Sequence, residues 1–407
     1  NMYGGNENLE AIELIKHFNS ILKKRDPGVL SIAEESTAFP LITGSLEEGG
    51  LGFDLKWNMG FMNDYLDYIK YDPYFRSHHH GELTFSMIYA YSEKFMLVFS
   101  HDEVVHGKGT LLGKMPGDRA QKLANLRLTY GYMMTHPGKK LLFMGQDFAQ
   151  YDEWSENQEL EWNLLEYPVH EGVQDFVRDL NAVYRTHPAL WQQDYVTDGF
   201  EWINCSYQEE SMVMFVRKTD KPEETLLVVS NFDNVAHSKF RVGVPFMCSA
   251  KSLISSDDKK YGGSGAVKRT AHKAVKADWD ERDYAVDLEI PAMSTTIYQL
   301  TPCAEPAPKA TEAKKAATKK TAAKKTVPKK AGSEEKAALV SPKKTARKKT
   351  TVPKQMTEAK ASAQAVEVAK AEPKKPASKS TGTKASAQRK SVQKAALDQK
   401  LTKRRKG

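Results

Sequence analysis

The sequence from 97 to 108 reads Leu97-Val-Phe-Ser-His-Asp-Glu-Val-Val-His-Gly-Lys108, an apolar strand that leads directly into acids flanked by histidines. About sixty residues earlier, Val29-Leu-Ser-Ile-Ala33 is a similar run that ends in Glu34 and Glu35. Carboxylates at the C-terminal ends of buried parallel strands are the arrangement that (β/α)8 barrels use for catalysis. Paired carboxylates are also the usual groups for cleaving glycosidic bonds. The two segments therefore predict a parallel α/β fold with acids at its catalytic rim.

The residues around these two strands predict an alternation of helices and strands. Residues 8–24 place apolar side chains at spacings of three and four, which indicates an amphipathic helix with Asn6 or Asn8 as its cap. A second helix is predicted over 116–135, and a short buried strand over 140–145. About three or four such units fit before residue 190, which is half of a (β/α)8 barrel.

A second pattern begins near residue 195. Short β-rich runs are separated by turn residues, which is typical of an antiparallel sandwich. The predicted strands are 212–217, 225–231, 239–244, 285–290 and 294–300. The predicted domains are thus a half-barrel over 1–194 and an all-β sandwich over 195–302.

The rest of the chain, residues 303–407, is a basic tail that contains no aromatic residue. Residues 301–407 hold 30 Lys and Arg against 8 Asp and Glu, a balance of +22, whereas residues 1–300 have a balance of −14. A segment with so few apolar side chains is predicted to be disordered. Its charge suits a polyanion such as nucleic acid, although a solvated extension without function and an anchor to an anionic surface are alternatives.

The cysteines and the hydropathy pattern indicate in which cellular compartment the protein is expected. Cys205, Cys248 and Cys303 show no metal-binding spacing, and three free thiols suit a reducing cytoplasm. No apolar run approaches the roughly 20 residues of a membrane span, so no membrane contact is predicted. The chain begins with Asn1 rather than Met, as if it started inside a domain.

Several long motifs resemble one known family. The first 300 residues are similar to the C-terminal part of bacterial 1,4-α-glucan (glycogen) branching enzymes, which belong to the α-amylase superfamily. The resembling segments are Tyr3-Gly-Gly-Asn-Glu-Asn-Leu-Glu-Ala11, Ile32-Ala-Glu-Glu-Ser-Thr37, Gly52-Phe-Asp-Leu-Lys-Trp-Asn-Met-Gly60, His79-His80 with Leu83-Thr-Phe-Ser86, Ser100-His-Asp-Glu-Val-Val-His-Gly-Lys108 and Leu142-Phe-Met-Gly-Gln146.

This resemblance assigns roles to individual residues. It implies that Glu34 is the general acid/base, that Asp102 steadies the transition state, and that His101 binds sugar hydroxyls. Trp57 and Gln146 are predicted to contact the substrate as well. Glu34 and Glu35 are neighbours on a strand and face opposite ways, so only one of them can point into the site. The resemblance implies no metal and no organic cofactor.

The chain departs from the family in one respect. The family's Asp nucleophile lies on a strand that should come shortly before Tyr3, and the first four barrel strands are expected there too. Asp26, the only Asp within residues 1–28, lies in a turn. The polypeptide is therefore expected to be a fragment that is catalytically inert alone.

Other polar and aromatic residues have more ordinary interpretations. Consecutive histidines, as in His78-His79-His80, cannot all face one ion, so a partly exposed loop beside the glucan groove is expected rather than a metal site. Trp154 and Trp162 are candidates for stacking on sugar rings, but packing explains them equally well.

The sequence therefore predicts an enzyme that cleaves α-1,4-glucans with retention and transfers the segment to a 6-hydroxyl, forming α-1,6 branches in glycogen. One alternative is a related glucan hydrolase of the α-amylase superfamily. A second is an inactive fragment whose tail binds polyanions.

Overall fold

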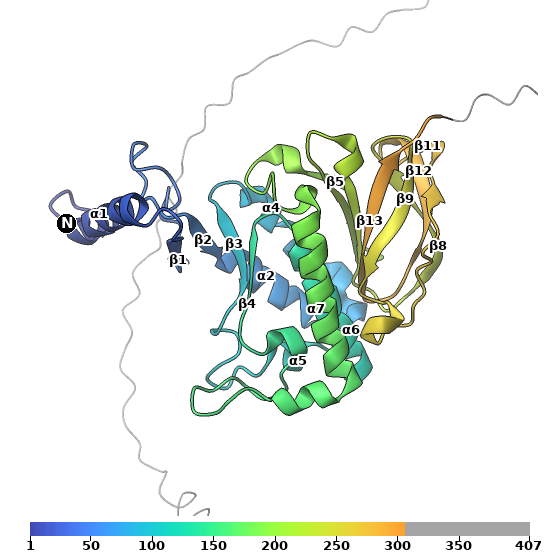
Figure 1. Cartoon of the computed structure of the whole chain (residues 1–407), viewed down its shortest axis with the longest axis horizontal. Coiled ribbons are helices and arrows are strands. Elements are labelled where there is room, and N and C mark those ends of the chain that lie inside the picture. The colour runs from blue at the N-terminus through green and yellow to red at the C-terminus, as the bar shows by residue number, and fades with distance from the viewer. Residues whose placement is uncertain (306–407) are drawn as a thin grey trace, which may run out of the picture. The chain divides into compact units, whose positions relative to one another are not determined.

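The computed structural model describes residues 1–305, and Figure 1 labels most of its helices and strands. The first helix, α1 (Leu9–Arg25), confirms the predicted helix, and the Asn8 side chain caps it by accepting a hydrogen bond from the Ala11 N–H at 3.0 Å. Its apolar stripe is only partly covered, since Leu14 and Phe18 are exposed. The predicted tail, 303–407, lies outside the described residues beyond Glu305.

Four parallel strands form the first sheet, in the order β1-β2-β3-β4. They are β1 (Ile32–Ala33), β2 (Leu55–Asn58), β3 (Phe95–Phe99) and β4 (Lys139–Leu142), and Figure 1 shows them side by side. The prediction of a buried strand over 29–33 was wrong, because β1 has two residues and Val29 and Leu30 are exposed. Likewise β4 is half-buried rather than buried.

Helices cover one face of this sheet. The longest are α6 (Arg119–Thr135), where a helix was predicted, and α7 (Pro168–Thr186). The shorter helices are α2 (Met59–Ile69), α3 (Gly81–Thr84), α4 (Ser86–Tyr89) and α5 (Leu111–Lys114). Short 3₁₀ helices lie at Pro73–His79, Gln146–Phe148, Trp162–Glu166, Pro188–Leu190, Thr197–Gly199, Pro222–Glu224 and Lys259–Tyr261.

Helix α6 is buried on almost every side, including polar side chains such as Arg127, which donates to the Ser256 carbonyl at 2.9 Å. It begins with a capping box, in which the Asp118 and Gln121 side chains each accept a hydrogen bond from the other's backbone N–H, both at 2.9 Å. Tyr132 on α6 stacks with Phe61 and Tyr65 of α2, with ring centroids 6.4 and 5.5 Å apart. This aromatic cluster joins the two helices beneath the sheet.

The second part of the chain is a sandwich of antiparallel strands, as predicted. One sheet has the order β10-β9-β13-β7-β6-β5 and the other β11-β12-β8. The strands are β5 (Phe200–Tyr207), β6 (Met212–Arg217), β7 (Leu226–Asn231), β8 (His237–Val244), β9 (Cys248–Ser255), β10 (His272–Lys273), β11 (Val275–Trp279), β12 (Arg282–Ile290) and β13 (Ser294–Pro302).

The larger sheet is buried on both faces. Along β6, Met212 and Met214 belong to the core between the two sheets, whereas Val213 and Phe215 belong to the core shared with α6 and α7. Neighbouring residues of a strand point to opposite faces of the sheet. A strand that contributes to a core on each face therefore needs apolar residues at consecutive positions. This explains why β6 shows no polar alternation.

A buried charged cluster links this sheet to the parallel one. The Arg217 guanidinium donates to Asp194 Oδ1 at 2.8 Å and to the carbonyl of Thr135 on α6, also at 2.8 Å. Lys139 of β4 reaches Asp194 Oδ2 at 2.9 Å. Burial, more than the neighbouring charges, lowers the pKa of Lys140 to about 7. The cluster therefore brings Arg217, Lys139 and Lys140 together around the buried carboxylate of Asp194.

Within residues 1–305, no helix combines the length and apolar character needed to cross a membrane.

Candidate active site

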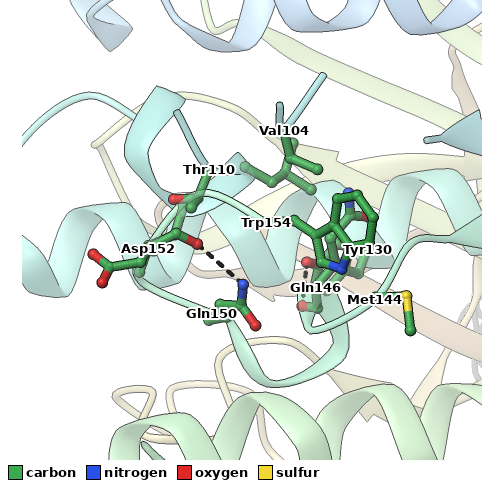
Figure 2. Close-up of a pocket in the computed structure, with 11 residues that line it drawn as sticks. Val104, Thr110, Tyr130, Met144, Gln146, Gln150, Asp152 and Trp154 are labelled. Atoms are coloured by element: carbon green, nitrogen blue, oxygen red, sulfur yellow. Dashed lines mark hydrogen bonds between the residues drawn. The ribbon is translucent and has the colours of Figure 1, made fainter. Parts of the chain in front are cut away.

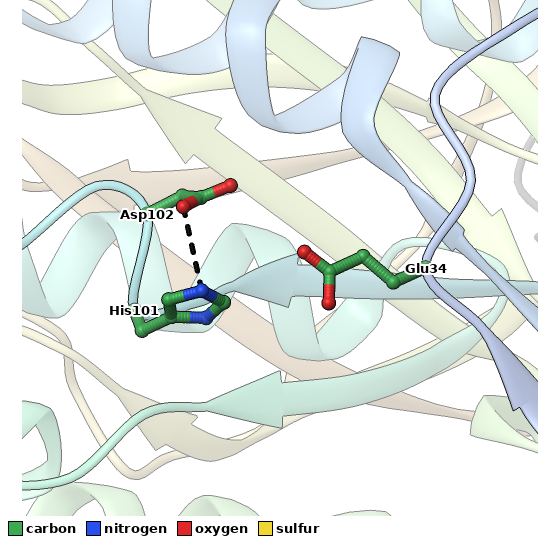
Figure 3. A group of neighbouring side chains, drawn as sticks. All are labelled: Glu34, His101 and Asp102. Carbon is green, nitrogen blue, oxygen red and sulfur yellow. Dashed lines mark ion pairs between the residues drawn. The ribbon is translucent and has the colours of Figure 1, made fainter.

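Glu34, His101 and Asp102 meet at the carboxyl ends of the parallel strands. Glu34 follows β1, and the other two follow β3. One side-chain atom from each of the three lies within 4.8 Å of the others, as Figure 3 shows. His101 Nε2 is 3.4 Å from Asp102 Oδ1. Two segments that are 67 positions apart in the sequence thus place two carboxylates and an imidazole at one rim.

A tight turn after β3 presents His101 and Asp102. The buried Glu103 carboxylate accepts a hydrogen bond from the Ser100 N–H at 2.5 Å, and Ser100 Oγ accepts one from the Asp102 N–H at 3.2 Å. Lys108 Nζ donates to the Asp102 carbonyl at 2.6 Å. Because the backbone is bound on both sides, the turn directs Glu103 inward and leaves the side chains of His101 and Asp102 partly exposed.

Glu34 and Glu35 both follow β1 but face different partners. Glu34 is exposed and faces the cluster, whereas Glu35 Oε2 lies 3.0 Å from the ammonium of Lys56 on β2. The Thr37 N–H donates to Glu35 Oε1 at 2.8 Å, and Lys56 Nζ donates to the Thr37 carbonyl at 3.0 Å. We call this arrangement of Glu35, Lys56 and Thr37 the latch. It fixes which of the two acids points into the site.

The latch also acts on the ionisation of Glu35. Partial burial raises the pKa of this carboxyl, but the hydrogen bonds from Thr37 and Lys56 outweigh burial and hold the pKa below its ordinary value. Glu35 is therefore a paired, ionised group. An acid that donates a proton to a leaving group must be protonated, so its ionised state disfavours Glu35 for that role.

An aromatic row lies along the same rim. The Trp57 and His101 rings have centroids 6.4 Å apart, and Phe143, just after β4, is 6.0 Å from His101 and 5.1 Å from Trp154. Trp57 is half-buried beside the cluster. The structure thus brings Trp57 to the predicted site, where its role in stacking stays a prediction.

Gln146 occupies a different place. It is buried and lines a small cavity together with Tyr130 and Trp154, shown in Figure 2. Its Oε1 accepts from the Phe143 N–H at 3.1 Å, and its carbonyl accepts from the Tyr130 hydroxyl at 2.6 Å. None of the three clustered residues lines this cavity. Gln146 therefore braces the turn after β4, and its contact with substrate stays a prediction.

The three histidines differ in burial: His78 is exposed, His79 half-buried and His80 buried. His79 Nδ1 lies 2.8 Å from Glu82 Oε1, and its ring stacks on Tyr71. His80 is buried with Nε2 2.8 Å from the carbonyl of Cys205, and burial lowers its pKa. The run is thus partly exposed, as expected, but it ends a 3₁₀ helix rather than lying in a loop. Among the described residues, the one group with metal-ligand geometry is the Glu34, His101 and Asp102 cluster.

Glu153 fixes the loop after Asp102, and no sequence pattern predicted this role. Glu153 accepts hydrogen bonds from the N–H groups of Gly107 at 2.9 Å and Gly109 at 3.0 Å. These backbone hydrogen bonds lower the pKa of Glu153. Both glycines have positive φ, a conformation that residues with a side chain disfavour. The two closely spaced glycines after Asp102 were therefore the sequence feature that indicated a tight turn here.

The chain is similar to known proteins over most of its length. Residues 202–301 match the family described as "Alpha amylase, C-terminal all-beta domain". A 1,4-alpha-glucan branching enzyme of Oceanobacillus iheyensis is 44% identical over 300 residues, which are 74% of this chain and 47% of that protein. One of Aquifex aeolicus is 50% identical over 294 residues, 72% of this chain and 47% of that protein. The chain thus spans less than half the length of these relatives.

Among solved structures, a debranching enzyme of Nostoc punctiforme has the same fold in part. It aligns with a TM-score of 0.50 and 15% identity, over 70% of this chain and 54% of that chain. At this identity the likeness extends to the fold alone. It agrees with a partial barrel followed by an all-β sandwich.

Proposed function

We propose that this polypeptide, most of which is homologous to the C-terminal part of bacterial 1,4-alpha-glucan branching enzymes, takes part in forming α-1,6 branches on an α-1,4-glucan. The reaction would cleave an α-1,4 bond with retention and transfer the segment to a glucan 6-hydroxyl. The observation that carries this proposal is the meeting of Glu34, His101 and Asp102 within 4.8 Å at the strand ends. Two carboxylates with a hydroxyl-binding imidazole are groups that glycosyl transfer uses.

Glu34 is the proposed general acid/base. It would protonate the glycosidic oxygen while an Asp nucleophile, supplied by the part of a complete enzyme that this chain does not contain, bonds to the anomeric carbon. It would then accept the proton of the 6-hydroxyl that displaces this Asp and forms the new α-1,6 bond. Its exposure at the rim leaves it open to a glucan from solvent. Neither step requires a metal or organic cofactor.

Asp102 and His101 are the proposed hydroxyl-binding pair. They are adjacent to Glu34 and fixed by the turn after β3, so they can hold the sugar ring while its charge develops. Trp57 is proposed to pack against the apolar face of a sugar, because its ring lies beside His101. Such contacts contribute to rate when they strengthen in the transition state.

A chimera tests the proposal. This chain's branching-enzyme segment would replace the corresponding part of the Oceanobacillus iheyensis enzyme, to which it is 44% identical. The chimera is expected to reduce iodine staining of amylose without an increase in reducing ends. Loss of staining together with new reducing ends would indicate a hydrolase instead, and a folded chimera with neither change would overturn the proposal.

The tail and the compartment are separate parts of the proposal. The balance of +22 in residues 301–407, without aromatic side chains, supports binding to polyanions through charge alone. Cys205, Cys248 and Cys303 are unpaired in the described part of the chain, which supports a cytoplasmic location.

A further inference from the structure

A large groove adjoins the clustered residues. It has a volume of about 780 Å³ and is lined by Asp102 and by one face of helix α2. That volume lies within the range of about 300–1,000 Å³ that is usual for ligand sites. The residues of α2 that line it are Met59, Met62, Asn63, Leu66 and Asp67, followed by Lys70 at the C-terminal cap of the helix.

The lining has two chemical zones. Met62 and Leu66 are buried and give the groove an apolar floor, whereas Asn63 and Asp67, one residue further along the helix in each case, are exposed at its edge. These spacings of three and four place all of them on one face of the helix. A glucan presents apolar sugar faces and a rim of hydroxyls, so an apolar floor with polar edges matches it.

The charges in the groove balance. Lys70, Lys108 and Lys114 line it together with three acids, Asp67, Asp102 and Glu103. Lys70 Nζ is paired with Asp67 Oδ1 at 2.5 Å, and Lys108 Nζ is bound to the Asp102 carbonyl at 2.6 Å. A site with no excess cation favours a neutral polyhydroxyl chain over a phosphate or another anion.

We propose that this groove, which we call the α2 groove, binds the acceptor glucan whose 6-hydroxyl receives the transferred segment. The inference rests on the proposed function and adds the site that decides between transfer and hydrolysis. Because Asp102 belongs to both the groove and the cluster, a chain bound along α2 ends beside Glu34. Holding the acceptor there raises its effective concentration against water.

Binding is measured first, without catalysis. Maltoheptaose is titrated calorimetrically into the whole 407-residue chain and into its Asn63→Ala/Asp67→Ala variant. Losing two polar contacts is expected to weaken binding about tenfold. The matched control is Asp64→Ala, an acid on the same helix that does not line the groove, and it is expected to bind like the parent chain.

The second measurement separates an acceptor site from a general glucan contact. In the branching chimera, the double variant is expected to lower the ratio of branches formed to reducing ends released, because water replaces the acceptor. An unchanged ratio and unchanged maltoheptaose binding in the double variant would overturn the α2 groove. Absence of any binding by the parent chain would also overturn it, whereas the proposed function fails only if the parent chimera does not branch amylose.

Discussion

Replacing Lys56 by Met tests how the latch positions Glu34. The Lys56 side chain is 8% exposed and Glu35 27%, so their ion pair lies between the surface and buried cases. Exposed pairs contribute up to about 1 kcal/mol, and breaking a buried pair costs about 3–5 kcal/mol. With the lost hydrogen bond to the Thr37 carbonyl, we expect Lys56→Met to lower the free energy of unfolding by about 2 kcal/mol.

Urea unfolding of the 407-residue chain, followed by tryptophan fluorescence, measures this loss. Lys16→Met is the matched control, because Lys16 pairs with Glu13 at 3.8 Å on the exposed side of α1 and is expected to cost well under 1 kcal/mol. In the chimera, Lys56→Met is expected to lower kcat about tenfold with little change in KM, and Lys56→Arg to restore most of it. A Lys56→Met chain as stable and as active as its parent would refute the role of the latch.

The pH dependence of the same variant gives a second readout. The pKa of Glu35 is lowered in the folded chain, so the unfolded chain binds more protons once this carboxyl begins to titrate. Its contribution is present above the unfolded pKa of about 4.5 and is lost as pH falls through the folded pKa. The stability difference between parent and Lys56→Met is therefore expected to be larger at pH 7 than at pH 3. A difference that grows on acidification would contradict this sign.

Four further predictions concern other parts of the chain. In the chimera, Asp102→Asn should lower kcat far more than it raises KM, and an effect confined to KM would reduce Asp102 to ground-state binding. Asp194→Asn should cost about 3–5 kcal/mol in urea unfolding, because it leaves the buried Arg217 without its counter-charge; a loss below about 1 kcal/mol would contradict this. Burial lowers the pKa of Lys140 to about 7, so the unfolded chain binds more protons and the free energy of unfolding should rise from pH 7 to pH 9. Lys140→Met should flatten that rise, and an unchanged slope would exclude Lys140 as its cause. Duplex DNA should be retained by the chain at about 50 mM salt and released log-linearly as salt increases, and deletion of 303–407 should abolish retention without affecting the chimera's chemistry; retention by the deleted chain would show that the tail is not responsible.

Much of the architecture could be predicted from local patterns. Strand β3 is an apolar run that ends at the Asp102 motif, and α6 begins where Asp118 and Gln121 form a capping box. The sandwich strand β6 is an apolar run, and β13 is rich in the β-branched residues that favour strands. In each case the residues that specify the element lie within it or next to it.

The missed features depend on partners that are distant in the sequence. Strand β2 contains a buried lysine, and its partners, the Glu35 carboxylate and the Thr37 carbonyl, lie about twenty residues earlier in the sequence. The apolar run at 29–33 suggested a buried strand, but periodicity cannot show that β1 lies at the edge of the described sheet. Similarly, the alternation of Glu34 and Glu35 was predictable, whereas the side each one faces was set by Lys56.

The central claim is that Glu34, and not its neighbour, transfers the proton. The measurement that tests it most directly is the initial rate of amylose branching by the chimera with Glu34→Gln, compared with Glu35→Gln. Loss of a general acid/base is expected to lower the rate by about 10²–10⁴-fold. Glu35→Gln, which only weakens the latch, should lower it about tenfold. A Glu34→Gln chimera that branches amylose at nearly the parent rate would contradict the claim.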